Sequence, residues 1–197
     1  SQSWQEQLAG VPERLSLPTD YPRDAKRSRA ARYLPVEISA KTTAQLQRLA
    51  NQHQTTLFTV LAAFYGTLLG RLANQSDVVI GSPVAGRMTP EIDRHIGFFV
   101  NTLALRVDAT DHPDLNTLIE RVKGRVNHAL THQDLPFERL VEDLGVTRSL
   151  THTPLFQAML SWQTQESFAL SLSDLAVDML PVTLDQTKFD LTLSIAP

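Results

Sequence analysis

The sequence predicts an α/β (α+β) fold, in which a mixed β-sheet carries helices packed on one face. Two short apolar runs, residues 78–80 and 99–103, have the length and composition of buried strands. Residues 57–72 place apolar side chains nearly all around a helix, which is typical of a helix buried on most faces. Residues 191–195 alternate apolar and polar side chains, as a half-buried strand does. Because helices and strands are intermixed, we expect them to share one core.

The length and composition narrow the class of protein. A chain of 197 residues suits a single domain with a sizeable core. Its 18 basic and 21 acidic residues give a net charge of −3, so charge gives no reason to expect a nucleic acid or an anionic membrane as partner. The lack of cysteine excludes disulfides and thiolate nucleophiles and fits a cytoplasmic protein. Polar residues interrupt the apolar run 57–72, which we interpret as a core helix and not a membrane span.

The N-terminal part of the chain has the composition of a linker. Residues 1–35 are polar and contain four prolines, which favour extended, solvated backbone over a packed helix. A basic run in this stretch could bind an acidic carrier protein or be a solvated charged face. The run consists of Arg23, Lys26, Arg27, Arg29 and Arg32. Residues 36–38 are expected to form a brief strand, after which Ser39 caps a helix that reaches about His53.

Two further helices are expected in the second half of the chain. Asp114 can cap a helix that runs to about His132. His132, Gln133 and Asp134 then break that helix, and Asp134 is placed to cap the next one. Pro136 suits the first turn of this next helix, and Gly145 ends it. Capping does not explain His132 and Gln133, whose side chains could project from the break as a polar lining.

Polar residues also occur at the ends of the two apolar strands. The first strand is expected to stop at residues 81–83, because glycine admits unusual backbone angles and proline lacks a ladder donor. No GxSxG elbow surrounds Ser82, so a local cap is favoured over a nucleophile there. Asn101 and Thr102 lie on opposite faces of the second strand, which begins at Phe98 or Phe99, and each needs a hydrogen-bond partner. We expect at least one of them to face a polar group.

Three blocks of the sequence, taken in order, resemble the condensation domains of nonribosomal peptide synthetases. The blocks are IGFFVNT at 96–102, HQDLPFE at 132–138 and the looser RSLTHTPL at 148–155. Similar residues at 17–23 and 188–193 extend the resemblance over nearly the whole chain. It implies one half of a chloramphenicol acetyltransferase-like pair of subdomains. Residues 1–35 would be the segment linking the halves and residues 36–197 the C-terminal subdomain, which we expect to continue beyond both ends.

The N-terminal half of such domains carries a paired-histidine motif, HHxxxDG, and none of the six histidines here is adjacent to another. We therefore interpret the chain as a C-terminal half that lacks the catalytic histidine and is inactive alone, and we assign no catalytic residue to it. In the family, the 4'-phosphopantetheine arms of a donor and an acceptor carrier protein enter a tunnel between the halves. The second histidine of the motif positions or deprotonates the acceptor amine for amide formation.

The resemblance implies that this half supplies one wall of the tunnel. The supporting residues would be Arg71, Ser82, Asn101, His132 and Gln133. Structural motif positions would be Gly97, Phe99, Thr102, Asp134, Pro136, Phe137, Arg148 and Pro154. Arg71 would pair with the aspartate of HHxxxDG; alternatively it reaches solvent or interacts with the negative end of its own helix.

Two details modify these expectations. His128 and His132 lie four residues apart, a spacing that can bind a metal, but there is no HExxH pattern and no cysteine, so we predict no metal site. The third block departs from the usual RDxSRNPL because Ser149 stands for Asp and residues 151–153 stand for Ser-Arg-Asn. This departure weakens the case for the family's polar network at that turn.

Three functions remain open at this point. The favoured one is part of a condensation domain, with both carrier proteins, an adjacent adenylation domain and the missing N-terminal subdomain as partners. A second is a non-catalytic module that docks a carrier protein. A third is a heterocyclisation or epimerisation relative; epimerisation domains carry a different motif at residues 99–102, whereas a heterocyclising domain would differ chiefly in the other half. An exposed sheet face or edge would favour self-association.

Overall fold

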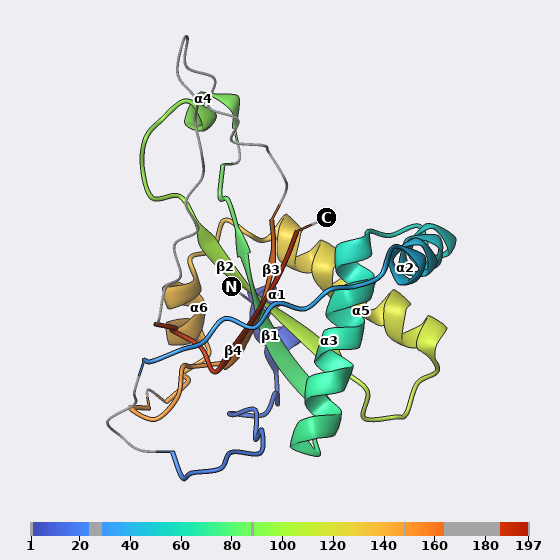
Figure 1. Cartoon of the computed structure of the whole chain (residues 1–197). Coiled ribbons are helices and arrows are strands. Elements are labelled where there is room, and N and C mark those ends of the chain that lie inside the picture. The colour runs from blue at the N-terminus through green and yellow to red at the C-terminus, as the bar shows by residue number, and fades with distance from the viewer. Residues whose placement is uncertain (1, 24–28, 88, 148, 164–185, 197) are drawn as a thin grey trace, which may run out of the picture.

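The computed structural model describes residues 2–23, 29–87, 89–147, 149–163 and 186–196 (Figure 1). Four strands form one mixed sheet in the order β2-β1-β3-β4. They are β1 (Asp77–Val84), β2 (Asn101–Asp108), β3 (Ala158–Trp162) and β4 (Leu191–Ile195). The pair β1–β2 is antiparallel, whereas β1–β3 and β3–β4 are parallel. The mixed α/β class predicted from the sequence is confirmed.

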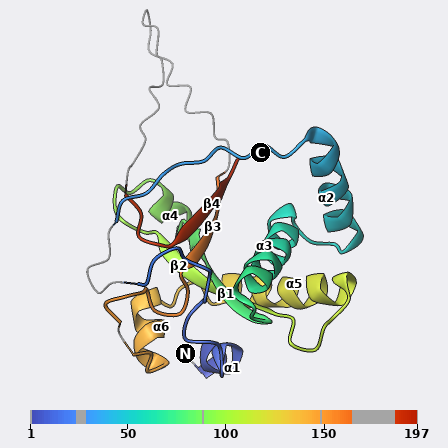
Figure 2. The same cartoon turned by 60° about the horizontal axis from the view of Figure 1, so that its bottom comes forward.

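Six helices accompany the sheet in the described part of the chain. They are α1 (Gln2–Leu8), α2 (Ala40–Gln52), α3 (Leu57–Ala73), α4 (Pro90–Asp93), α5 (Leu115–Thr131) and α6 (Phe137–Asp143). The long helices α3 and α5 pack together against one face of the sheet (Figure 2). Ser39 and Asp114 cap α2 and α5 as predicted, since their side chains accept from the backbone N–H of Thr42 and Thr117.

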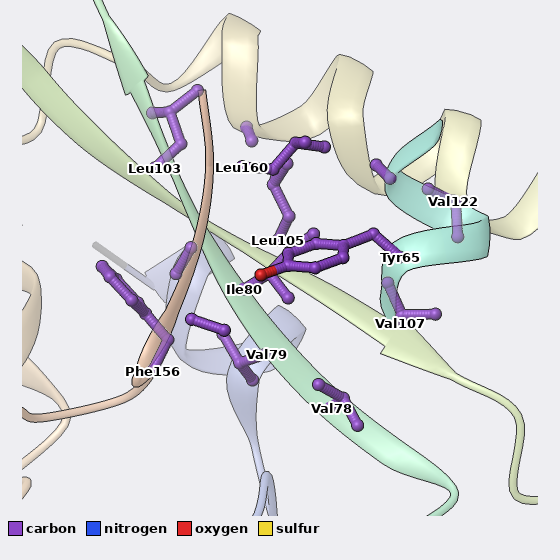
Figure 3. Packing of buried hydrophobic residues seen from close by; sticks show 14 of the residues in the cluster. Tyr65, Val78, Val79, Ile80, Leu103, Leu105, Val107, Val122, Phe156 and Leu160 are labelled. Atoms are coloured by element: carbon purple, nitrogen blue, oxygen red, sulfur yellow. The ribbon is translucent and has the colours of Figure 1, made fainter. Parts of the chain in front are cut away.

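Close packing of α3 on the sheet depends on a glycine. A Cβ on Gly66 would lie 2.5 Å from Cγ2 of Val107, so no larger residue fits there without a shift. The core between the layers contains Ile80 of β1 and Leu105 of β2, which are paired across the two strands and point to the same face (Figure 3). Successive residues of β1 alternate, so Gly81 faces the opposite side, where the ring of Phe156 fills the space above it.

The opposite face is partly covered by the N-terminal segment, contrary to the prediction of a solvated linker. Residues 2–8 form α1, and the side chains of Trp4, Leu8 and Leu15 are buried. Arg106 of β2 donates to the backbone carbonyls of Gln7 and Ala9. The prediction failed because the prolines of this segment all lie at or after Pro12, beyond α1. Within residues 2–8, a few correctly spaced apolar side chains are enough to dock a short helix.

Three other expectations are wrong. Residues 36–38 form no strand, and Val36 is exposed. The strand β1 does not stop at Ser82: it continues to Val84, because Pro83 still pairs opposite Thr102 in the β1–β2 register. β2 begins at Asn101, two or three residues later than expected. A continuous partner strand explains why β1 tolerates glycine and proline.

The helix α3 is less buried than its composition suggests. Phe64, Leu68 and Leu72 form a stripe at helical spacing and are 38%, 55% and 53% exposed. In the part of the chain that the structure describes, none of the helices is by itself long and apolar enough to cross a bilayer; α2 and α3 meet that measure only together, across a bend of 106°. The sequence also predicts a polar loop at residues 163–167 and a short strand near residues 176–179, and residues 164–185 lie outside the part of the chain that the structure describes.

Candidate active-site wall

Asn101, at the first position of β2, is the centre of a hydrogen-bonded junction. Its Nδ2 donates to the backbone carbonyls of Gln133 and Leu135, each at 2.8 Å. Its Oδ1 accepts from the backbone N–H of Phe137 at 3.1 Å and of Thr102 at 2.8 Å. Both donors and the acceptor oxygen of the amide are therefore occupied, and Asn101 joins the sheet to the break between α5 and α6.

This junction replaces the cap that the sequence predicted for α6. The N-cap residue is Pro136, and the helix has no cap from a side chain at its own N-terminus. Asp134 is exposed and does not cap, contrary to the prediction. The Oδ1 of Asn101 accepts the first N–H of the helix instead, from a strand more than 30 residues earlier. The amide within an otherwise apolar strand was the available signal, since such a group must find partners.

His132 and Gln133 do not project from the break. The His132 Nδ1 lies 2.9 Å from the carbonyl oxygen of His128, and the His132 ring stacks on the His128 ring at 4.3 Å. The Nε2 of Gln133 donates to the carbonyl of Leu130 at 2.9 Å. Both side chains therefore bind backbone carbonyls at the C-terminal end of α5 and do not project from the break, and their place in a tunnel wall stays a prediction.

Ser82 and Arg71 lie at opposite ends of β1. Ser82 pairs opposite Leu103, two residues from Asn101 along β2, and both face the same side of the sheet. The Ser82 hydroxyl is nearly buried and makes no hydrogen bond with the described residues. Arg71 follows Gly70 of α3, and a Cβ added at Gly70 would lie 3.3 Å from Cγ2 of Val78, near the start of β1. Its side chain is exposed, and the structure gathers Ser82, Asn101 and Gln133 but not Arg71.

The loop between β1 and β2 is held by internal contacts and carries large apolar side chains on its surface. Arg87 donates to the carbonyls of Ile92 and His95 and places its guanidinium 4.8 Å from the centre of the Phe99 ring. Gly86 has φ +66°, and a Cβ there would collide with the Phe99 carbonyl oxygen at 1.8 Å. Two large apolar side chains of this loop are nonetheless exposed to solvent. Ile96 is fully exposed and Phe98 is 91% exposed.

The turn before β3 forms a polar network with residues other than those of the family pattern. Thr153 Oγ1 donates to the carbonyl of Phe156, and the buried Gln157 donates to the carbonyl of Thr153 at 2.7 Å. Pro154 contributes its carbonyl to the N–H of Phe156. Arg148 lies outside the described residues. The Phe156 ring contacts Phe137, so this turn packs against α6.

No group of three or more His, Asp or Glu side chains among the described residues could hold a metal ion. The arrangement therefore offers a rigid junction of sheet, helix break and turn beside an apolar loop.

Comparison with known proteins identifies the family. The family described as Condensation domain matches residues 1–197. The chain belongs to the condensation domain family. It is 44% identical over 195 residues to malpinin synthetase of Mortierella alpina and 42% identical over 193 residues to an isonitrile lipopeptide synthase of Mycobacterium tuberculosis. These alignments cover 99% and 98% of this chain but 2% and 8% of the two relatives.

Solved structures agree on the condensation-domain fold. The X-domain from teicoplanin biosynthesis superposes with a TM-score of 0.91 at 26% identity, over 99% of this chain and 44% of that one. A four-domain nonribosomal peptide synthetase, AB3403, gives a TM-score of 0.76 at 33% identity, over 81% of this chain and 12% of that one. The condensation domain of the polyketide synthase MokA, at 20% identity, shares the fold. Its TM-score is 0.76 over 99% of the present chain and 48% of the MokA chain.

Proposed function

We propose that this chain is the C-terminal half of a peptide-bond-forming condensation domain and acts together with a half that carries HHxxxDG. The observation that supports this most directly is the apolar loop beside the Asn101 junction. Ile96 and Phe98 belong to the family motif and are exposed, although large apolar side chains are favoured in contact with other apolar groups. A second subdomain would cover them and close a channel over this end of the sheet.

In this proposal the chain contributes shape and position, not the proton-transferring group. The carrier-borne 4'-phosphopantetheine arms supply the thioesters that react. Asn101 fixes the helix break, and the Ser82 hydroxyl lies on the same face of the sheet. Holding the acceptor amine against the donor thioester is itself a large part of the rate enhancement expected for such a reaction. The paired histidine of the other half would position or deprotonate the amine.

The test is a single-turnover assay with donor-loaded and acceptor-loaded carrier proteins. The chain is supplied alone, the HHxxxDG half is supplied alone, and then both are mixed, with dipeptidyl product read by intact-protein mass. We expect product with both halves and none with this chain alone. Product from the chain alone would contradict the proposed division of labour.

Two matched pairs of variants sharpen the test. Replacing Phe98 by Ser should weaken association of the halves, whereas Leu150→Ser, at an equally exposed site in another loop, should not. Asn101→Asp removes both donors to the break and sets a carboxylate against two carbonyl oxygens, so product should fall. Asn127→Asp, on an exposed position of α5, is its control. Equal activity of the Asn101 and Asn127 variants would show that the Asn101 junction does not contribute to product formation.

A second candidate is a non-catalytic docking module. It is favoured by the higher TM-score with the X-domain, a protein solved in complex with OxyB, than with AB3403 or MokA. The same assay separates the two candidates. A docking module would co-elute with a loaded carrier or another partner protein in size-exclusion chromatography. It would form no product even when an HHxxxDG half is present.

A further inference from the structure

The helix α1 is held on the end of α5 by a cluster of rings centred on His128. The His128 ring meets Trp4 edge-on, with 5.2 Å between centroids, and stacks on His132. Ser3 Oγ is hydrogen-bonded to the His128 Nε2, and the Trp4 indole N–H donates to the His132 carbonyl at 3.2 Å. Since Trp4 is buried, His128 forms much of the surface on which α1 rests.

The charged groups that surround His128 are cationic. On α5, Arg125 precedes it by three residues and His132 follows it by four. On β2, Arg106 lines the same small cavity as His128, and its charge is shared with Asp77. The residues of α1 at this contact, Ser3, Trp4, Gln7 and Leu8, do not titrate. In the described residues no carboxylate forms an ion pair with His128, and the nearby Asp77 is bound to Arg106, so no carboxylate in direct contact would stabilise a proton on the ring.

We propose that His128 is a pH-sensitive latch for α1: the helix is docked while His128 is neutral, and protonation releases it locally while the sheet stays folded. Partial burial, His132 and Arg125 hold the pKa of His128 below its ordinary value of 6.5. Release removes the part of this burial that α1 supplies, whereas Arg125 and His132 stay beside His128 on α5 and at its C-cap. A released His128 therefore binds a proton more readily than a docked one, and docking weakens as the pH falls through the histidine range. Release would remove the Trp4 hydrogen bond from the His132 carbonyl, which lies beside Gln133 and next to the Asn101 junction.

Hydrogen exchange measured by mass spectrometry on the full chain tests the latch. Amide protection of residues 2–8 and of residues 77–84 is compared at about pH 7.5 and about pH 5.5, on either side of the histidine range, after correction for intrinsic exchange. We expect a several-fold loss of protection in α1 at the lower pH and no loss in β1. Unchanged protection of α1 would overturn the proposal, as would equal loss in both segments, because that is global unfolding.

Variants assign the effect to His128. His128→Gln keeps a hydrogen-bonding side chain that stays neutral, so the pH dependence of α1 protection should disappear. The control is His112→Asn, in an exposed turn with φ +52° that asparagine tolerates, and it should keep the normal response. If His128→Gln loosens α1 at every pH, NMR titration of the native His128 ring decides. Its midpoint should coincide with that of α1 release, and a separate midpoint overturns the latch.

Discussion

Two stretches near the N-terminus, residues 2–17 and 29–38, have similar apolar side chains and opposite fates. In the first stretch these side chains enter the core and are 3%, 3% and 5% exposed at Trp4, Leu8 and Leu15. In the second they face solvent and are 74%, 78% and 75% exposed at Tyr33, Leu34 and Val36. Apolar content alone therefore does not decide which part of an irregular segment is buried.

The two stretches differ in whether side chains from the sheet and its neighbouring elements hydrogen-bond to their backbone. Arg106 binds the carbonyls at the end of α1. Gln75 accepts from the N–H of Ser16, and Gln157 accepts from the N–H of Leu15 at 2.6 Å. The second stretch is joined near its start by an isolated bridge between Ala30 and Gln186, and residues 32–39, which follow, are exposed. Side chains that satisfy backbone groups allow a segment without regular structure to be buried.

The largest expected effect comes from removing the buried anchor of the first stretch. Trp4→Ala should lower the free energy of unfolding by about 3–5 kcal/mol, because it leaves a cavity and removes a large aromatic contact. Tyr33→Ala, the matching change in the second stretch, should stay within about 0.5 kcal/mol. Denaturant titration followed by circular dichroism measures both. Similar losses for the two variants would abolish the contrast between the stretches.

Removing the arginine clamp should have the next largest effect. Arg106→Met keeps the aliphatic stem but leaves Asp77 and the carbonyls of Gln7 and Ala9 without their donor, at a cost of about 2–3 kcal/mol. The pKa of Arg106 is raised by its hydrogen bonds to Asp77, so the clamp stays charged across the range in which the protein is studied. Arg32→Met, on the exposed stretch, is the control. A loss no greater than that of the control would mean that packing alone docks α1.

The buried glutamine tests the same idea without charge. Gln157→Leu should cost about 2 kcal/mol, because the N–H of Leu15 and the carbonyl of Thr153 lose their partner in the interior. Gln47→Leu, which removes an exposed bond within α2, should be nearly neutral. Faster exchange at Leu15 in the first variant would locate the damage. Unaltered exchange there would show that the amide does not hold this segment.

The smallest effect is expected where the exposed stretch ends. Ser39→Ala should cost about 1 kcal/mol, because the side chain of Ser39 caps α2. Ser16→Ala, whose backbone and not its hydroxyl is held by Gln75, should change stability little. The midpoints of thermal unfolding distinguish them. An equal shift would imply that α2 does not depend on its cap.

Features set by neighbouring residues were predictable from the sequence. The caps at Ser39 and Asp114 and the end of α6 at Gly145, with φ +62°, each depend on residues within one or two turns. The family motifs were recognisable for the same reason, because each is contiguous.

Features that depend on distant partners were not predictable. Asn101 caps α6 from another element, Pro83 stays in a strand because β2 lies opposite, and α1 docks on residues more than 90 positions away. Within the site, the sequence suggested that Asn101 and the helix break belong together, and the structure brings them together. It could not show that His132 and Gln133 fold back onto α5, because that depends on Trp4 and on free carbonyls at the helix end.

The docking of α1 also constrains the order of events during synthesis. Trp4 donates to the carbonyl of His132, 128 positions later, and the N–H of Leu15 donates to Gln157, 142 positions later. At roughly 5–20 residues per second, that interval is about 6–30 seconds. The first helix must therefore remain undocked until α5 has been made, and Leu15 remains without its partner until β3 begins. The amphipathic face of α1 is open to chaperones during this time, and a pause in translation before α5 is complete would prolong that exposure.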